Sequence, residues 1–285
     1  MKLPALLLLL GLSVPLVGAP PEKPVILNGK NSLRAGTVLR EKREVMVANG
    51  TMTVQAAQKQ VIGMRWMQRH TLVRRLQGNS AEEVEVRDHS VEEARFKPGG
   101  PQPGSAIQKG PLMGKKLLAR RLTSGWDFRP AQGKPTVEEN DALLKLAFFS
   151  AILEVIPAAL GTQSHRPGES WKPDLPMPRG KANGIAIFKD VEVGFGSIEE
   201  RPDGPHAHLF ISGSFTVQRP LGYLATAQAT FGIALTRRLS DQVDVETTIK
   251  GTFKDEATIR LEDGGSGSIA HEFPYVVTRS IEIER

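Results

Sequence analysis

Two histidines separated by one residue are the clearest candidates for chemistry in this sequence of 285 residues. His206 and His208 flank Ala207 at the expected start of a strand. Because side chains alternate along a strand, both imidazoles would point to one face, where they could bind a metal or act as a base. Spacing identifies no third ligand, and Pro205-His206 is also typical of the end of a turn. We therefore expect no metal, no cofactor and no catalytic residue, and a His-based hydrolase is the alternative.

Other motifs for catalysis are weaker. The sequence has no cysteine, which excludes disulfides, thiolate metal sites and a cysteine nucleophile. No Gly-x-Ser-x-Gly elbow stands between a strand and a helix. The glycine-rich stretch at 264–268 lacks the Lys-Ser/Thr ending of a phosphate loop, so it indicates a hairpin turn. Acidic clusters such as Glu82-Glu83-Glu85 are typical of solvated faces rather than of a glycosidase pair.

Basic residues exceed acidic ones by a small margin, 37 Lys and Arg against 31 Asp and Glu. This surplus is spread over a large surface, so we expect no nucleic-acid partner. It is densest between residues 109 and 134, where Asp127 alone opposes it. On neighbouring strands these side chains could face anionic headgroups or polysaccharide, or they could simply protect sheet edges from aggregation. The residues concerned are Lys109, Lys115, Lys116, Arg120, Arg121, Arg129 and Lys134.

The N-terminus predicts an exported protein. A basic Lys2, an apolar stretch over residues 3–17 and the small residues Gly18 and Ala19 form the layout of a signal peptide at residues 1–19. The apolar stretch is shorter than the roughly 20 residues of a membrane span, which favours a cleaved signal. We expect the mature protein to be periplasmic or extracellular. Residues 20–35 are expected to form an extended leader, and the pattern leaves the oligomeric state open.

A nearly all-apolar helix is predicted in mid-chain, over residues 136–156. Thr136 followed by Glu139 has the spacing of a capping box. A helix that is apolar on all sides is buried either in a bilayer or inside a protein. Lys145 and Glu154 lie within the apolar stretch and would be costly in a bilayer. We therefore expect this helix inside the protein, which is then not an integral membrane protein.

Alternating apolar and polar residues predict long antiparallel strands on both sides of the helix. The pattern is clearest over residues 211–217, 223–235 and 243–253, each with one buried face. In the first half, Asn49-Gly50 stands between two patterned stretches and predicts a tight hairpin turn.

These elements predict an α+β, mainly β fold of about ten strands. A flat sheet could cover only one side of the helix, so we expect a curved antiparallel sheet, a half-barrel, wrapped around it. One domain at 36–285 would contain two strand meanders, 36–130 and 184–285. Incomplete packing around the helix would leave an apolar cavity for a ligand. The candidate contacts in that cavity are Phe148, Phe149, Ile152 and Leu153.

Two short stretches carry a resemblance to known proteins. Pro111-Leu112-Met113-Gly114-Lys115 and Pro167-Gly168-Glu169-Ser170-Trp171 occur in the same order, around an apolar helix, as in a group of uncharacterised exported bacterial proteins. The layout also resembles the half-barrel of LolA-like and LppX-like lipoprotein carriers. That resemblance implies a curved sheet that closes over helices and can hold acyl chains. This sequence departs from it in having one obvious helix rather than several.

The function expected from these patterns is that of a non-enzymatic binding or envelope-associated module, with a lipid-like or apolar ligand. Two alternatives stay open. One is an envelope hydrolase that uses His206 or His208, and the other is a structural partner of another envelope protein.

Overall fold

The computed structural model describes residues 23–29, 33–56, 58–78, 81–101, 103–122, 125–175, 186–218, 226–260 and 265–284. The predicted signal peptide at residues 1–19 lies outside this part of the chain, and so does part of the predicted leader.

The described chain forms two runs of strands with two helices between them. The first run comprises β1 (Val25–Ile26), β2 (Val38–Gln55), β3 (Lys59–Gly78), β4 (Ala81–Phe96), β5 (Gln108–Lys109), β6 (Lys116–Leu122) and β7 (Gly125–Pro130). The middle of the chain comprises α1 (Val137–Leu153), α2 (Val155–Leu160), β8 (Ser164–His165) and β9 (Ser170–Trp171). The second run comprises β10 (Ala186–Arg201), β11 (Gly204–Gln218), β12 (Thr226–Arg238), β13 (Val243–Arg260) and β14 (Ser266–Glu284).

Apart from β1, both runs belong to one antiparallel sheet. Its strand order is β7-β6-β4-β3-β2-β14-β13-β12-β11-β10-β9, with β5 paired to β4, giving 12 strands. The last strand, β14, pairs with β13 on one side and with β2 on the other, and so joins the two meanders. Residues far apart in the sequence therefore lie side by side in one continuous sheet. The predicted mainly β fold with a curved antiparallel sheet is confirmed.

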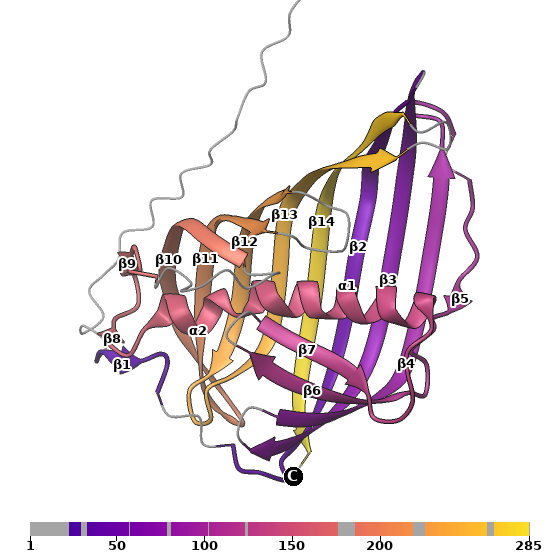
Figure 1. The fold of residues 1–285 in the computed structure, drawn as a ribbon. Coiled ribbons are helices and arrows are strands. Elements are labelled where there is room, and N and C mark those ends of the chain that lie inside the picture. Colours follow the sequence, from indigo (N-terminus) through magenta and orange to yellow (C-terminus); the bar gives the residue numbers. More distant parts are fainter. Residues whose placement is uncertain are drawn as a thin grey trace, which may run out of the picture.

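The helices lie across the strands on one face of this sheet (Figure 1), and β6 and β7 lie beside α1 on the same side. Two groups of buried apolar residues hold α1 there. Leu143 and Leu146 pack with Leu72 and Val84 of the first meander. Ile152 belongs to the larger core, which is built mainly from the inner faces of β10 to β14. The helix thus bridges both halves of the sheet.

The start of α1 has the predicted capping box. The Thr136 hydroxyl accepts a hydrogen bond from the Glu139 backbone N–H at 3.2 Å, and the Glu139 carboxylate accepts one from the Thr136 N–H at 2.9 Å. The predicted end is less accurate, because α1 stops at Leu153 and α2 begins at Val155. Pro157 explains the break: it cannot donate to the Leu153 carbonyl, and its ring crowds that carbonyl.

The described helical stretch Val137–Leu160 is long and apolar enough to span a membrane, with a mean hydropathy of 2.0. About half of the most apolar 18-residue window in this stretch, 53%, is buried inside the protein. Its packing against the sheet accounts for this apolar composition, as the sequence predicted.

The expected hairpin turn at Asn49-Gly50 is wrong. β2 runs through these residues without reversing, and the chain turns only between Gln55 and Lys59. Between Val47 and Gly50 the pairing of β2 with β3 shifts by one residue. Ala48 and Asn49 of β2 therefore stand opposite the single residue Arg65 of β3, in a bulge. A Cβ on Gly50 would lie 2.7 Å from the Met64 side chain. The glycine is therefore required by close packing in the bulge.

The leader is attached to the domain where it is described. β1 pairs with β8, through Val25 with His165 and Ile26 with Ser164. Leu27 is fully buried in the main core. The Pro- and Gly-rich stretch that follows β4 is a long connection with the short β5 in it.

Candidate functional site

The four predicted apolar contacts lie together on α1, and most of them pack against the protein itself. Phe149 and Ile152 are buried, with exposed fractions of 7% and 1%. The Phe148 ring packs against Phe253, with ring centroids 5.5 Å apart, and belongs to the same core. Leu153 differs, because it also lines an open cleft. The candidate site is therefore the cleft on the side of α1 where Leu153 lies.

This cleft, called here the arginine cleft, has a volume of about 310 Å³. It lies between the C-terminal part of α1, β7 and the sheet floor. Its lining comprises Asn28, Gly29, Glu41, Arg43, Leu72, Arg74, Arg121, Trp126, Phe128, Ser150, Leu153, Glu154, Pro157, Arg237, Gln242, Asp244 and Arg279. Volumes of this order are typical of small-molecule sites.

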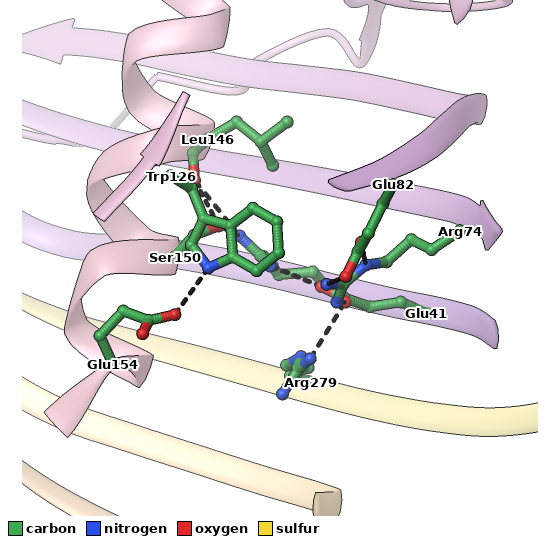
Figure 2. Close-up of polar contacts among 9 residues, drawn as sticks. Glu41, Arg74, Glu82, Trp126, Leu146, Ser150, Glu154 and Arg279 are labelled. Carbon is green, nitrogen blue, oxygen red and sulfur yellow. Dashed lines mark hydrogen bonds and ion pairs between the residues drawn. The ribbon is translucent and has the colours of Figure 1, made fainter. Parts of the chain in front are cut away.

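One wall of the arginine cleft is apolar. Trp126 and Phe128 come from β7 and stack on each other, with ring centroids 6.0 Å apart. Leu153 and Pro157 face the cleft from the helices. The Trp126 indole N–H donates to the Glu154 carboxylate at 2.7 Å, which fixes the plane of the ring (Figure 2). This wall offers a fixed aromatic surface for an apolar group.

The opposite floor is charged and centred on Glu41 of β2, which is fully buried. Its Oε1 accepts from Arg43 Nη2 at 2.6 Å, and its Oε2 accepts from Arg74 Nη1 at 2.5 Å and from Arg279 Nη2 at 3.2 Å. Arg43 lies on β2, Arg74 on β3 and Arg279 on β14. Figure 2 shows Arg74 and Arg279 reaching toward Glu41. Burial alone would raise the pKa of Glu41, but Arg279, Arg43 and Arg74 outweigh it and hold the pKa well below its usual range.

Further ion pairs extend this floor on both sides. Arg74 also donates to Glu82 of β4 at 2.7 and 2.9 Å, and its guanidinium lies over the Trp126 ring, 5.5 Å from the centroid. Toward the second meander, Arg237 of β12 donates twice to Asp244 and once to a backbone carbonyl. The floor therefore contains two bidentate pairs, Arg74–Glu82 and Arg237–Asp244, on either side of Glu41.

A buried histidine pair borders the floor. His70 lies next to Arg43 in the sheet register and stacks on His89 of β4, with ring centroids 4.4 Å apart. His89 Nδ1 accepts from the Leu112 backbone N–H at 3.0 Å. Burial lowers the pKa of both histidines, that of His89 to about 4. Both rings are neutral at ordinary pH, so they add no charge to the arginine cleft.

The two histidines singled out from the sequence lie elsewhere. His206 and His208 flank Ala207, whose side chain is buried in the main core, so their rings lie on the opposite face of β11. His206 is hydrogen-bonded to the Gly204 carbonyl at 2.8 Å, and His208 to Glu199 at 3.0 Å. Within the described residues, no group of three His, Cys, Asp or Glu side chains is arranged to hold a metal. Each of these two rings is thus accounted for by a local contact.

The basic stretch at 109–134 is partly neutralised. Lys115 pairs with Glu139 and Arg129 with Asp127, at 2.6 and 2.7 Å. Arg121 pairs with Glu154 at the rim of the arginine cleft. Several of these residues therefore belong to local ion pairs.

Sequence reasoning missed the charged floor, although the sequence contains a signal for it. Glu41 and Arg43 stand in phase with Leu39, Val45 and Val47, which are all buried. Alternation therefore places two charges on the buried face of the sheet. Buried charges must be paired, so this rule could have identified Glu41 and Arg43 as members of a buried ion cluster, although not their partners on other strands.

Comparison with known proteins gives little information about the site. No protein-family model matches the sequence, and no curated protein matches it. Among solved structures, lipovitellin, in a study of its lipid–protein interactions, is similar with a TM-score of 0.41 and 9% identity. The similarity covers 88% of this chain and 26% of lipovitellin, so the chain spans about a quarter of that protein's length. A likeness this low carries no functional argument, and the site rests on its own residues.

Proposed function

We propose that this protein is an exported, non-enzymatic binding module whose ligand is an amphipathic, lipid-like molecule held in the arginine cleft. The observation that carries this proposal is the contrast between the walls of one cleft. Trp126, Phe128 and Leu153 form an apolar wall, and the arginines paired with Glu41 form a charged floor. A molecule with one apolar and one polar end matches both surfaces.

Two features of the chain support this assignment. The signal-like residues 1–19 favour export, and hence a periplasmic or extracellular location. The order of elements resembles that of lipoprotein carriers with a half-barrel sheet, which can hold acyl chains. Of the four apolar contacts predicted from the sequence we keep Leu153, and we place the ligand between it and Trp126. Phe149 is less suitable, because it is already in contact with Tyr275 and Trp66.

The first experiment is native mass spectrometry of the protein purified from its own envelope, together with titration of decan-1-ol and decanoate into delipidated protein. We expect a copurifying molecule with an alkyl chain and saturable binding of at least one probe. Protein that is reproducibly empty and binds neither probe would contradict the proposal.

A matched pair of variants on α1 locates the ligand. Leu153→Asn places an amide in the wall of the arginine cleft and is expected to weaken binding of both probes by about tenfold or more. Leu144→Asn changes a residue on the same helix that is 39% exposed and does not line the cleft. It should leave both affinities unchanged. Equal effects of the two variants would place the ligand elsewhere.

A further inference from the structure

The charged floor contains one arginine whose hydrogen-bonding capacity is largely unused. A guanidinium carries five N–H donors. Arg279 on β14 makes one hydrogen bond, from Nη2 to Glu41 at 3.2 Å, which is long for a charge-assisted bond. Its Nε is buried and has no hydrogen-bond partner among the residues that the structure describes. This side chain therefore retains donors for a further acceptor.

The neighbouring arginines are more fully engaged. Arg43 donates to Glu41 through Nε and Nη2 and to Ser150 through Nη1. Arg74 uses Nε, Nη1 and Nη2 on two carboxylates, and Arg237 uses the same three atoms on Asp244 and the Leu27 carbonyl. At each of these three arginines all three guanidinium nitrogens are already engaged, whereas Arg279 uses only Nη2 among the described residues.

The numbers of arginines and carboxylates in the arginine cleft also favour binding of a further negative group. The lining of the arginine cleft includes five arginines and three carboxylates. Glu82 does not line the cleft but is paired with Arg74, and so adds a fourth carboxylate. Because Arg43, Arg74 and Arg279 share Glu41, these five arginines face four carboxylates, and the group carries one excess positive charge. An excess charge of this kind is costly unless a counter-ion compensates it.

A second unused group lies beside Arg279. Thr247 of β13 stands directly opposite Arg279 in the sheet register. It is 3% exposed, and its hydroxyl has no hydrogen-bond partner within the described part of the chain. Two adjacent strands therefore place a cationic donor and a free hydroxyl next to each other on the sheet floor.

We propose that Arg279 is the receptor for an anionic group, a carboxylate or a phosphate, on the amphipathic ligand. This inference rests on the proposed function and names the chemical class of the polar end. The apolar part lies against Trp126 and Leu153, and the anion accepts hydrogen bonds from the unused guanidinium N–H groups. Binding supplies the negative charge that the arginine cleft lacks.

The test compares probes that share an alkyl chain and differ in charge. Decanoate, methyl decanoate, decan-1-ol and inorganic phosphate are titrated into delipidated wild-type protein by calorimetry. We expect decanoate to bind about ten- to a hundredfold more tightly than its ester, since hydrogen bonds between charged groups are stronger than neutral ones. This arm uses only the wild type and does not depend on whether a variant folds.

Variants then assign the preference to one residue. Arg279→Gln should bring the affinity for decanoate down to that for the ester, and Arg279→Lys should retain part of the difference, because lysine keeps the charge but not the planar fork. Arg129→Gln is the control, because Arg129 is 76% exposed, is paired with Asp127 and does not line the arginine cleft. It should leave the preference unchanged.

The outcomes separate this inference from the proposed function. If the ester, the alcohol and decanoate bind equally, the anion site is wrong and the amphipathic cleft stands. If decanoate is preferred but the preference survives in folded Arg279→Gln protein, Arg279 is not the receptor. If phosphate alone binds as tightly as decanoate and Arg279→Gln abolishes both, the site serves a free anion rather than a lipid headgroup. If no probe with an alkyl chain binds, the proposed function itself fails.

Discussion

Arg43 Nη1 donates a hydrogen bond to the Ser150 hydroxyl at 3.1 Å, which links residues 107 positions apart in the chain. Arg43 belongs to the sheet floor and Ser150 to α1, and both are buried. The same guanidinium is bonded to Glu41. The charged floor therefore does two things: it lines the arginine cleft and it attaches the helix to the sheet.

Removing the helix side of this link should destabilise the protein. Ser150→Ala leaves Arg43 Nη1 without its acceptor at 3.1 Å, and we expect a loss of about 1–3 kcal/mol in the free energy of unfolding. Ser212→Ala, on the exposed face of β11, should change it by less than about 0.5 kcal/mol. Urea denaturation followed by circular dichroism measures both. Equal stability of the two variants would show that the link is not important for stability.

Removing the central carboxylate should have a larger effect. Glu41→Gln leaves Arg43, Arg74 and Arg279 without their shared counter-charge, and we expect a loss of about 3–5 kcal/mol. Glu44→Gln is the matched control on the same strand, because Glu44 is 37% exposed and pairs with Arg69 on the outer face. Its effect should stay below about 1 kcal/mol. Thermal unfolding of both variants compares them, and similar melting temperatures would contradict the central role of Glu41.

The buried histidine pair should make stability depend on pH. Burial lowers the pKa of His89 to about 4, whereas the unfolded chain takes up a proton near the ordinary histidine value of about 6.5. Stability is therefore greatest above the unfolded value and falls as the pH drops from about 6.5 to 4, by roughly 2–4 kcal/mol for this residue. Denaturation series at several pH values measure the slope.

The matching variants assign that slope to His89. His89→Asn keeps an acceptor for the Leu112 N–H but does not titrate in this range, so the loss on acidification should become smaller. Ser212→Ala, on the exposed face of β11, changes no titratable group and should leave the slope as in the wild type. An unchanged slope in His89→Asn would mean that other groups, such as carboxylates, cause the dependence.

The capping box offers a local test of how α1 begins. Thr136→Ala removes the acceptor of the Glu139 N–H, and we expect a loss of about 1 kcal/mol. Val137→Ala, at a residue that is 84% exposed, is expected to have little effect. The two variants are compared by the midpoint of chemical denaturation. A loss in Val137→Ala as large as that in Thr136→Ala would argue against the cap.

The helix and the sheet could be predicted because their signals are local. Thr136 and Glu139 mark the start of α1, and alternation in β11 to β13 marks one buried face. The join between the meanders was not predictable in this way. It depends on β14 pairing with β2 across more than 200 residues of chain, as in Val277 with Val45.

The site was predictable only in part. The sequence indicated Leu153 on the helix as a ligand contact. It did not show that Phe149 and Ile152 are buried in the main core and leave no space for a ligand. The charged floor required knowing that Glu41, Arg74 and Arg279 come from neighbouring strands, and strand order is not encoded locally. The error at Asn49-Gly50 has the same origin, since close packing against Met64, and not a turn, requires the glycine there.

Photocrosslinking with a diazirine-labelled decanoate, followed by peptide mapping, tests the central claim most directly. If the arginine cleft binds an amphipathic ligand, the label will be found on the cleft residues Trp126, Phe128, Leu153 and Pro157, and unlabelled decanoate will prevent it. Labelling confined to exposed apolar residues elsewhere, such as Phe210 on β11, or labelling that decanoate does not prevent, would contradict the account.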